Sequence, residues 1–335
     1  MSESTLPRAP LSPALARWTA TSRCYLARKL PLTTRWVARQ QAAAVPLWFV
    51  VEATGVYYEE LAYFLADQQQ LLSVLLPNKV KHFARSTELK SKTDQLDARL
   101  LCRLGLERAL PAWRPPTPAL RQLRALARER QVLTKQGAQL KARVHAYQPN
   151  SRTLTRLAAQ QQLILQQLAA LDQDLTELLA AEPELARKLA QLTSIPGIGL
   201  TTAIIVVAET SGFAIVENER QLASYAGLDV VQRQSGLSSH ATRISKRGNT
   251  RLRTALYLPA LSSLRYNPWQ IAFYARLRTR HPSGKLGVIA VMRKLLVLCY
   301  SLWKNDQAYN PDYPTAHQSG HEIAPATEVS RGYTG

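Results

Sequence analysis

Short apolar runs alternate with helical spacing in the first third of the chain. Leu47–Val51 and Leu71–Leu76 are apolar runs of the kind that form buried strands. Between them, Tyr57–Gln70 repeats apolar positions at helical spacing, and Ser91–Leu110 does so after them. Strands that alternate with helices predict an α/β layer with a mostly parallel sheet.

Two shorter helices are expected over residues 33–44 and Val80–Arg85. The helix that follows has a capping signal at its start, because Ser91 can cap and Asp94 stands three residues on, as in a capping box. The first 20 residues are rich in Ser, Pro and Ala and are expected to be irregular.

Helical periodicity dominates after a proline-rich boundary that begins at Pro115. Residues 119–148 have a helical pattern, and Arg152–Ala181 forms a second long pattern with leucines along one side. Two long helices joined near Pro149 predict an antiparallel hairpin or coiled coil, which would serve dimerisation or span two domains. An ordinary helical bundle core is the alternative.

A turn that reads Ile-Pro-Gly-Ile-Gly precedes an apolar helix over Leu200–Glu209 and resembles a helix-hairpin-helix. In such a turn, Gly197 and Gly199 would let backbone N–H groups approach a phosphate at the helix N-terminus. A tight turn between packed helices is the other interpretation. Further helices are expected over Arg251–Leu264 and Gly287–Trp303, and the polar residues beyond them suggest a disordered tail.

The charge of the chain is concentrated in two blocks. The 335 residues carry 43 Lys+Arg and 23 Asp+Glu, a net charge of +20. Residues 85–153 have a net charge of +10, and residues 230–305 carry 14 basic and no acidic side chains, whereas residues 154–229 have a net charge of −5. Basic surfaces of this density favour a phosphate backbone as ligand, and the alternative is a solvated face with no specific ligand.

Composition excludes several other classes of protein. No stretch reaches the roughly 18 uninterrupted apolar residues of a membrane helix, and the start shows no secretory signal. Cys24, Cys102 and Cys299 lie far apart, too few for a disulfide framework or a thiolate zinc cluster. These features suit a protein of the bacterial-type cytoplasm, associated with the nucleoid and not with a membrane.

Three carboxylates could form a metal site. Asp94 and Asp97 are three residues apart in an expected helix and therefore face one side. Glu52 ends a buried strand, where open α/β sheets place their sites. Converging carboxylates in a basic protein suit a divalent cation, usually Mg²⁺. Taken alone, such residues are more often helix caps or surface charges.

Ser235 is a candidate nucleophile within the block that lacks carboxylates. Gly236 allows close backbone approach, and a serine hydroxyl can attack phosphorus if its proton is removed and the developing charge is stabilised. A bare Ser-Gly pair is more often a turn. The residues expected to contact nucleic acid are Lys92, Arg99, Arg233, Arg243, Lys246, Arg247, Asn249, Arg251, Arg253, Gly197 and Gly199.

Several of these motifs, in this order, resemble one family. They are Val51-Glu52-Ala53-Thr54-Gly55, then Lys92-Thr93-Asp94-Gln95-Leu96-Asp97-Ala98-Arg99, the Ile195–Gly199 turn, Ser235-Gly236, and Ile244-x-Lys246-x-Gly248-Asn249-x-x-Leu252-Arg253. Together they resemble the DEDD insertion-sequence transposases of the IS one-ten family. The resemblance runs from about Pro46 to Asp306. It implies a RuvC-like domain of RNase H type, then a coiled coil, then a smaller C-terminal transposase domain.

The resemblance also implies roles for the residues. Glu52, Asp94 and Asp97 would be three of four metal-binding acids, and Ser235 would be the nucleophile that joins covalently to DNA. The family uses a bridge RNA that pairs with target and donor. Partners would thus be DNA, RNA and further copies of the chain, as a dimer or tetramer through the helical region.

One part of the family pattern is missing. The pattern opens with a strand carrying Gly-Ile-Asp some 40–50 residues before the glutamate, whereas the only acidic residue before Glu52 is Glu3. The first acid, and with it the first strand, is expected to be absent. Loss of one carboxylate weakens metal binding, so this chain is expected to be catalytically poor.

The sequence therefore predicts an N-terminally incomplete α/β domain of RNase H/RuvC type, a long helical coiled coil and a mainly α C-terminal domain. The expected segments are 1–45 irregular, 46–114 RuvC-like, 115–190 coiled coil, 191–305 C-terminal transposase domain and 306–335 disordered tail. The expected function is that of a transposase or recombinase that exchanges DNA strands. A junction-resolving nuclease that uses only the acids, and a catalytically dead nucleic-acid-binding remnant, are the alternatives.

Overall fold

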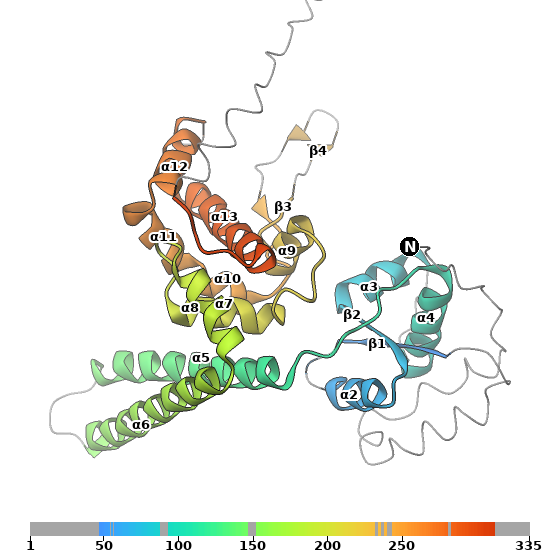
Figure 1. Cartoon of the computed structure of the whole chain (residues 1–335), viewed down its shortest axis with the longest axis horizontal. Coiled ribbons are helices and arrows are strands. Elements are labelled where there is room, and N and C mark those ends of the chain that lie inside the picture. Colours follow the sequence, from blue (N-terminus) through green and yellow to red (C-terminus); the bar gives the residue numbers. More distant parts are fainter. Residues whose placement is uncertain are drawn as a thin grey trace, which may run out of the picture. The chain divides into compact units, whose positions relative to one another are not determined.

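The chain divides into two compact units, residues 1–115 and 116–335 (Figure 1). The computed structural model describes residues 47–311 except 54, 56, 88–92, 147–151, 232–233, 236–237, 240–242 and 281–282. The irregular start, the helix expected over residues 33–44 and the tail after residue 311 lie outside the described residues. Each unit is described by itself.

A small parallel sheet forms the centre of the first unit. β1 (Trp48–Glu52) pairs in parallel with β2 (Leu71–Leu75), and Glu52 lies opposite Leu75 in the register. The connection is α2 (Glu59–Asp67), which is the crossover helix that parallel strands require. The parallel pairing predicted from the two apolar runs is confirmed.

Helices α3 (Pro77–Ser86) and α4 (Asp94–Glu107) complete this unit. Leu100 and Leu104 of α4 join Leu75 in one buried cluster, so α4 packs at the end of the sheet where the strands finish. The residue that caps α4 is Thr93, whose hydroxyl accepts a hydrogen bond from the Leu96 backbone. The cap expected at Ser91 falls outside the described residues.

Two long helices open the second unit. α5 (Pro118–Val144) and α6 (Arg152–Ala181) pack against each other, as the green helices of Figure 1 show. Arg130 of α5 bonds Asp172 of α6, whereas Gly137 faces Ile164. Residue numbers thus rise along α5 where those of the facing α6 residues fall, so the two helices are antiparallel. We refer to α5 and α6 together as the helix pair.

The remaining helices enclose one large core. They are α7 (Pro183–Thr193), α8 (Leu200–Thr210), α9 (Glu219–Ala226), α10 (Thr250–Ala255), α11 (Tyr257–Tyr266), α12 (Pro268–Arg280) and α13 (Gly284–Asn305). Within the described residues, α13 is the one helix long and apolar enough to span a membrane. Its apolar side chains, Val291, Leu295 and Cys299 among them, lie in this core.

The helix expected over Arg251–Leu264 is in fact two, α10 and α11, with a break at Leu256. Pro259 accounts for the break, because it has no N–H to donate to the carbonyl of Ala255 four residues earlier. Helices α9 and α12 were not predicted.

Four two-residue strands interrupt the helical core between α9 and α10. β3 (Val230–Val231) pairs with β6 (Arg243–Ile244), and β4 (Gln234–Ser235) pairs with β5 (Ser238–Ser239), both antiparallel. The segment from β3 to β6 is therefore a hairpin-like excursion whose two ends are held together, and we call it the serine hairpin. No strand was predicted in this part of the chain.

The glycine turn before α8 is a packing contact. Gly197 has a φ of +104°, and a Cβ atom there would lie 2.8 Å from the backbone nitrogen of Ser263 and 2.9 Å from the Pro259 carbonyl oxygen. Its lack of a side chain is required by the approach of α11. A Cβ at Gly199, the N-cap of α8, would meet no atom within 4 Å.

Substitution of these two glycines by alanine should change the free energy of unfolding by different amounts. Gly197→Ala is expected to lower the free energy of unfolding by more than about 2 kcal/mol, because it combines a left-handed backbone with a backbone clash. Gly199→Ala, the matched control, is expected to cost under about 1 kcal/mol. Chemical denaturation of both variants measures the difference, and equal losses would contradict the packing assignment.

Candidate functional site

Two of the three candidate acids share a helix that packs on the sheet. Asp97 precedes Leu100 and Leu104 by three and seven residues, so it lies on the face of α4 that is buried against the sheet. Glu52 is the last residue of β1 and is half-buried. Asp97 and Glu52 thus belong to the same end of the first unit.

The three acids do not form a ready metal site. Asp94 is exposed in the first turn of α4, one turn further than Asp97 from the leucines that pack on the sheet. No group of three Asp, Glu, His or Cys side chains in the described part of the chain is placed to hold a metal ion. The role of Glu52, Asp94 and Asp97 as metal ligands therefore stays a prediction, and carboxylate oxygens are the ligands that Mg²⁺ prefers.

Arg99 and Lys92 are the two predicted nucleic-acid contacts of this unit. Arg99 is exposed on α4 and lines a small hollow of about 170 Å³ together with Thr87 and Arg103. Lys92 lies outside the described residues.

Ser235 stands in β4, in the middle of the serine hairpin, and its backbone pairs with Ser238 of β5. Arg243 lies in β6 at the root of the hairpin, and Arg233 lies outside the described residues. The structure therefore places the candidate nucleophile in a short strand of the hairpin and not within a helix.

Hydrogen bonds at the root of the hairpin join its two ends just after α9. The backbone N–H of Ser245 donates to the Asp229 carbonyl at 2.9 Å, and that of Lys246 donates to the Gly227 carbonyl at 3.1 Å. The hydroxyl of Ser245 also donates to the Asp229 carboxylate. Lys246 has a φ of +51°, and its side chain and that of Arg247 are exposed. The fastened root thus presents two cationic side chains to solvent.

Two of the predicted nucleic-acid contacts have roles inside the protein. The Asn249 side chain accepts a hydrogen bond from the Leu252 backbone at 3.0 Å and so caps α10. The Arg253 guanidinium donates to the Ala226 carbonyl at 2.8 Å. Arg251, by contrast, is exposed. Packing and capping therefore explain Asn249 and Arg253 without a bound phosphate.

The polar centre of the second unit is Glu209, a residue that the sequence patterns did not predict. Its side chain is 2% exposed at the end of α8. Arg128 of α5 donates two hydrogen bonds to it, from Nε to Oε1 at 2.7 Å and from Nη2 to Oε2 at 3.0 Å. Asn249 Nδ2 donates to Oε2 at 2.6 Å. A single charge inside the apolar run of Leu200–Thr210 was the available signal.

Tyr225 closes this network. Its hydroxyl donates to the Glu209 backbone carbonyl at 2.9 Å and accepts from Asn249 Nδ2 at 3.1 Å. Burial raises the pKa of Glu209, but the hydrogen bonds from Arg128 and Asn249 and the charges of Arg128 and Arg251 outweigh it, so the pKa lies below its usual value. Glu209 is therefore an ionised carboxylate that joins α8 to α5 and to the start of α10, and Tyr225 links α9 to the same network.

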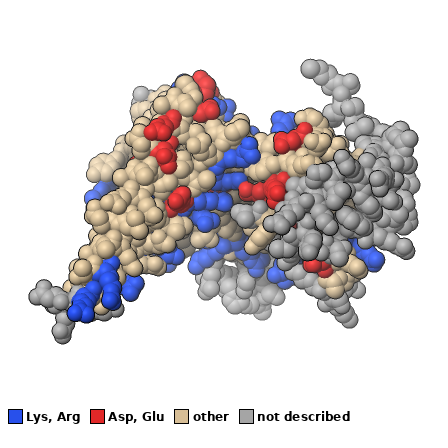
Figure 2. Space-filling model, turned by 90° about the horizontal axis from the view of Figure 1, so that it is seen from below, with Lys and Arg blue, Asp and Glu red and all other residues tan. Residues whose placement is uncertain are grey.

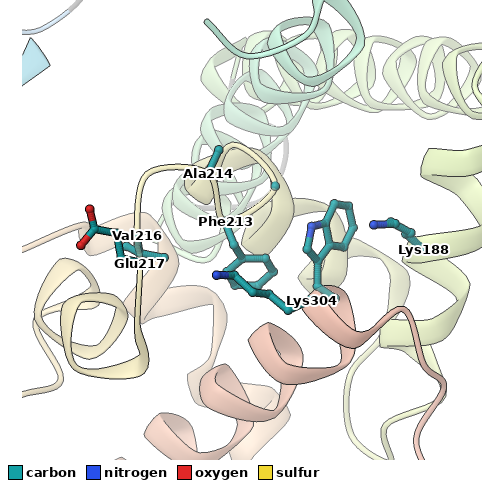
Figure 3. A pocket seen from close by; sticks show the side chains of 8 residues that line it. Lys188, Phe213, Ala214, Val216, Glu217 and Lys304 are labelled. Carbon is teal, nitrogen blue, oxygen red and sulfur yellow. The ribbon is translucent and has the colours of Figure 1, made fainter. Parts of the chain in front are cut away.

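The second unit has a hollow at the end of α13 (Figure 3). It encloses about 450 Å³ between α7, the turn after α8 and the end of α13. Lys188 points toward the indole ring of Trp303, with its Nζ 4.9 Å from the ring centroid, and Glu217 and Lys304 also line the hollow. Its mixed charges favour no single class of ligand.

Comparison with known proteins decides the family. Residues 23–148 match the DEDD transposase model of the IS110 group, and residues 189–275 match that of the transposase IS116/IS110/IS902 family. A pilin gene-inverting protein of Moraxella lacunata is 31% identical over 285 residues, which cover 83% of this chain and 86% of the relative. This chain belongs to the IS110 family of DEDD transposases.

Other relatives agree with that assignment. The pilin gene-inverting protein of Moraxella bovis is 30% identical over the same shares of the two chains. The transposase for insertion sequence element IS1111A of Coxiella burnetii is 40% identical over 76 residues, 23% of this chain and 21% of the relative. The chain is accordingly an enzyme of DNA transposition, and the DEDD domain implies an RNase H-like fold for the first unit.

A second carboxylate beside Glu209 should destabilise the transposase in a pH-dependent way. Asn249→Asp would put two carboxylates where one is now hydrogen-bonded, lowering the free energy of unfolding by about 3 kcal/mol near neutral pH. The pair's repulsion raises the folded-state pKa of one acid above its unfolded value, so the loss is greatest above that pKa and shrinks as pH falls through it.

Asn218→Asp is the matched control, because Asn218 also caps a helix, bonding the Gln221 backbone at 2.9 Å. Aspartate caps as well as asparagine, so this variant should match the parent protein at each pH. Denaturant titrations between about pH 8 and pH 5 measure both. A pH-independent loss in Asn249→Asp would count against the carboxylate network.

Proposed function

We propose that this transposase cuts and rejoins DNA strands with Ser235 as the nucleophile. The observation that carries the proposal is the place of Ser235 on a projecting hairpin whose root presents the exposed side chains of Lys246 and Arg247. A hydroxyl on such a turn can approach a phosphodiester, while cations beside it attract the backbone.

The proposed reaction is a transesterification. The serine oxygen bonds to phosphorus as its proton is removed, and the DNA oxygen that leaves takes up a proton. The phosphoserine bond conserves the energy of the broken ester, so a DNA hydroxyl can reverse the step and rejoin the strand. Cutting and rejoining then need no external energy source.

The carboxylates Glu52, Asp94 and Asp97 would supply oxygen ligands for a divalent cation, with Mg²⁺ as the expected ion. When bound, such an ion stabilises the negative charge that develops on the phosphate oxygens. Asp97 and Glu52 belong to one end of the first unit, which supports a shared role.

A basic cluster between α12 and α13 supports binding along the phosphate backbone. Lys294 Nζ lies 4.3 Å from the centroid of the Phe273 ring, and Arg276 Cζ lies 5.9 Å from the same ring. Burial lowers the pKa of Lys294, and the charge of Arg276 acts in the same direction. Two cations held together in a block without carboxylates favour an anionic ligand.

Phosphate contacts position nucleic acid but carry no sequence information. We therefore propose that base pairing to a guide RNA supplies the choice of target and donor, as the resemblance to the family implies. DNA and RNA would both bind the basic surfaces, in the cytoplasm where the chromosome lies.

Self-association through the helix pair fits the pattern of exposed side chains. Leu163 and Leu165 of α6 are about half exposed, at 53% and 50%, although both are large and apolar. Their burial in a dimer or tetramer would remove apolar surface from water.

A junction-resolving nuclease that uses only the acids is the second candidate function, and a remnant that binds without catalysis is the third. The names of the Moraxella relatives refer to inversion of a pilin gene. Inverting a gene requires that cut ends be rejoined, which favours strand exchange over cutting alone.

Ser235→Ala tests the nucleophile. The variant should form no covalent protein–DNA adduct on a denaturing gel, while its affinity for DNA stays within about twofold of the parent, since only one hydroxyl is removed. Ser238→Ala, which removes the hydroxyl of the register partner in the same hairpin, is the control and should keep the adduct.

The alternatives give other patterns in the same assay. A nuclease would continue to cut DNA after Ser235→Ala, and a remnant would bind DNA but form no adduct in any form. Persistence of the adduct in Ser235→Ala, or its loss in both variants alike, would refute the assigned role of Ser235.

A further inference from the structure

The basic excess of residues 85–153 is distributed unevenly over the fold. Residues 85–115 carry 7 basic and 4 acidic side chains, whereas residues 116–153 carry 8 basic and 1 acidic. Most of the net charge therefore lies on the helix pair and not around the helix that bears Asp94 and Asp97.

Basic residues without acidic neighbours in sequence occupy one end of the helix pair. From residue 131 to residue 171 the sequence contains five basic residues and no Asp or Glu. They are Lys135, Lys141, Arg143, Arg152 and Arg156, all of them exposed. Figure 2 shows basic side chains gathered at this end, at the lower left, with no acidic side chains beside them on that face. We call these five residues the basic tip.

The opposite end of the helix pair carries both basic and acidic side chains. Arg128 and Arg130 are bonded there to Glu209 and Asp172, and Asp174, Glu177 and Glu182 follow. From Arg128 to Arg143 the helix rises by about 22 Å. The end near the core thus carries both charge signs, whereas residues 131–171 carry basic side chains alone and extend well beyond the core.

The helix pair can hold such a tip in place. Leu133, Leu140, Leu157 and Ile164 form a buried seam between α5 and α6 close to the tip. The ion pair of Arg128 with Glu209 fastens the other end to the core. The cations of the basic tip repel one another, because exposed charges of one sign raise the energy of the compact state. A bound anion would reduce this repulsion.

We propose that the helix pair is a nucleic-acid-binding arm, whose basic tip grips a phosphate backbone about 20 Å beyond the core that carries the serine hairpin. This rests on the proposed action of the transposase on nucleic acid, and it adds a contact surface distant from the candidate nucleophile. A second copy of the chain is the less favoured occupant, because the tip offers charge and not the apolar side chains of Leu163 and Leu165 found mid-helix.

Salt dependence of binding tests the proposal. The double variant Lys141→Ala, Arg143→Ala removes two cations at the end of α5, where alanine preserves the helix. Binding to a short DNA duplex and, separately, to an RNA duplex is measured over a range of salt concentrations. The slope of log affinity against log salt should become shallower by about 0.9 for each phosphate that the variant no longer neutralises. The duplex whose slope changes identifies the nucleic acid that the arm binds.

The control removes two cations from the acidic part of the same unit, the half-buried Lys188 and the exposed Arg220, as Lys188→Ala, Arg220→Ala, and should leave the slope unchanged on both duplexes. Unchanged slopes in the tip variant, equal changes in both double variants, or a change in oligomeric state by sedimentation in place of a change in slope would each overturn the proposal. Adduct formation at saturating DNA should persist in the tip variant, so a failure here is separate from a failure of the Ser235 assignment.

Discussion

The ion pair between Arg128 and Glu209 fixes the arrangement of the second unit. A carboxylate that is 2% exposed has lost its hydration, and it is stable only because Arg128 and Asn249 supply hydrogen bonds from two other elements. The same contacts attach α5 to the core and hold the cap of α10. The orientation of the helix pair and the start of α10 therefore depend on one side chain at the end of α8.

Backbone contacts connect the network around Glu209 to the serine hairpin. Asn249 donates its backbone N–H to the Tyr225 carbonyl at 2.6 Å. A Cβ at Gly248 would overlap the same carbonyl, so only glycine permits this approach. The segment after β6 is thus held against the C-terminal end of α9. A projecting loop with a fixed root can carry a nucleophile to a substrate while its base stays in register with the core.

Charge is organised along the same elements. Acidic side chains partner the arginines where the helix pair joins the core, whereas the far end of the pair and the block of residues 230–305 keep their cations without carboxylates nearby in sequence. A chain with a net charge of +20 is therefore divided into a neutralised structural centre and basic outer surfaces. This division suits an enzyme that must hold polyanions without drawing them into its own core.

The sequence alone determined the strands of the first unit, most of the long helices and the family. Periodicity and short motifs are local signals. They identified the two parallel strands β1 and β2, the helix Arg152–Ala181 and the ordered motifs around Asp97 and Ser235. Only the tertiary structure decided what is buried with what. It assigned Asn249 and Arg253 to capping and packing, Gly197 to a helix contact, and the unpredicted Glu209 to the centre, because partners 81 and 40 residues apart meet only after folding. A buried charge requires hydrogen-bonding partners and so fixes the elements that supply them. Which residues are buried depends on the fold of the whole chain.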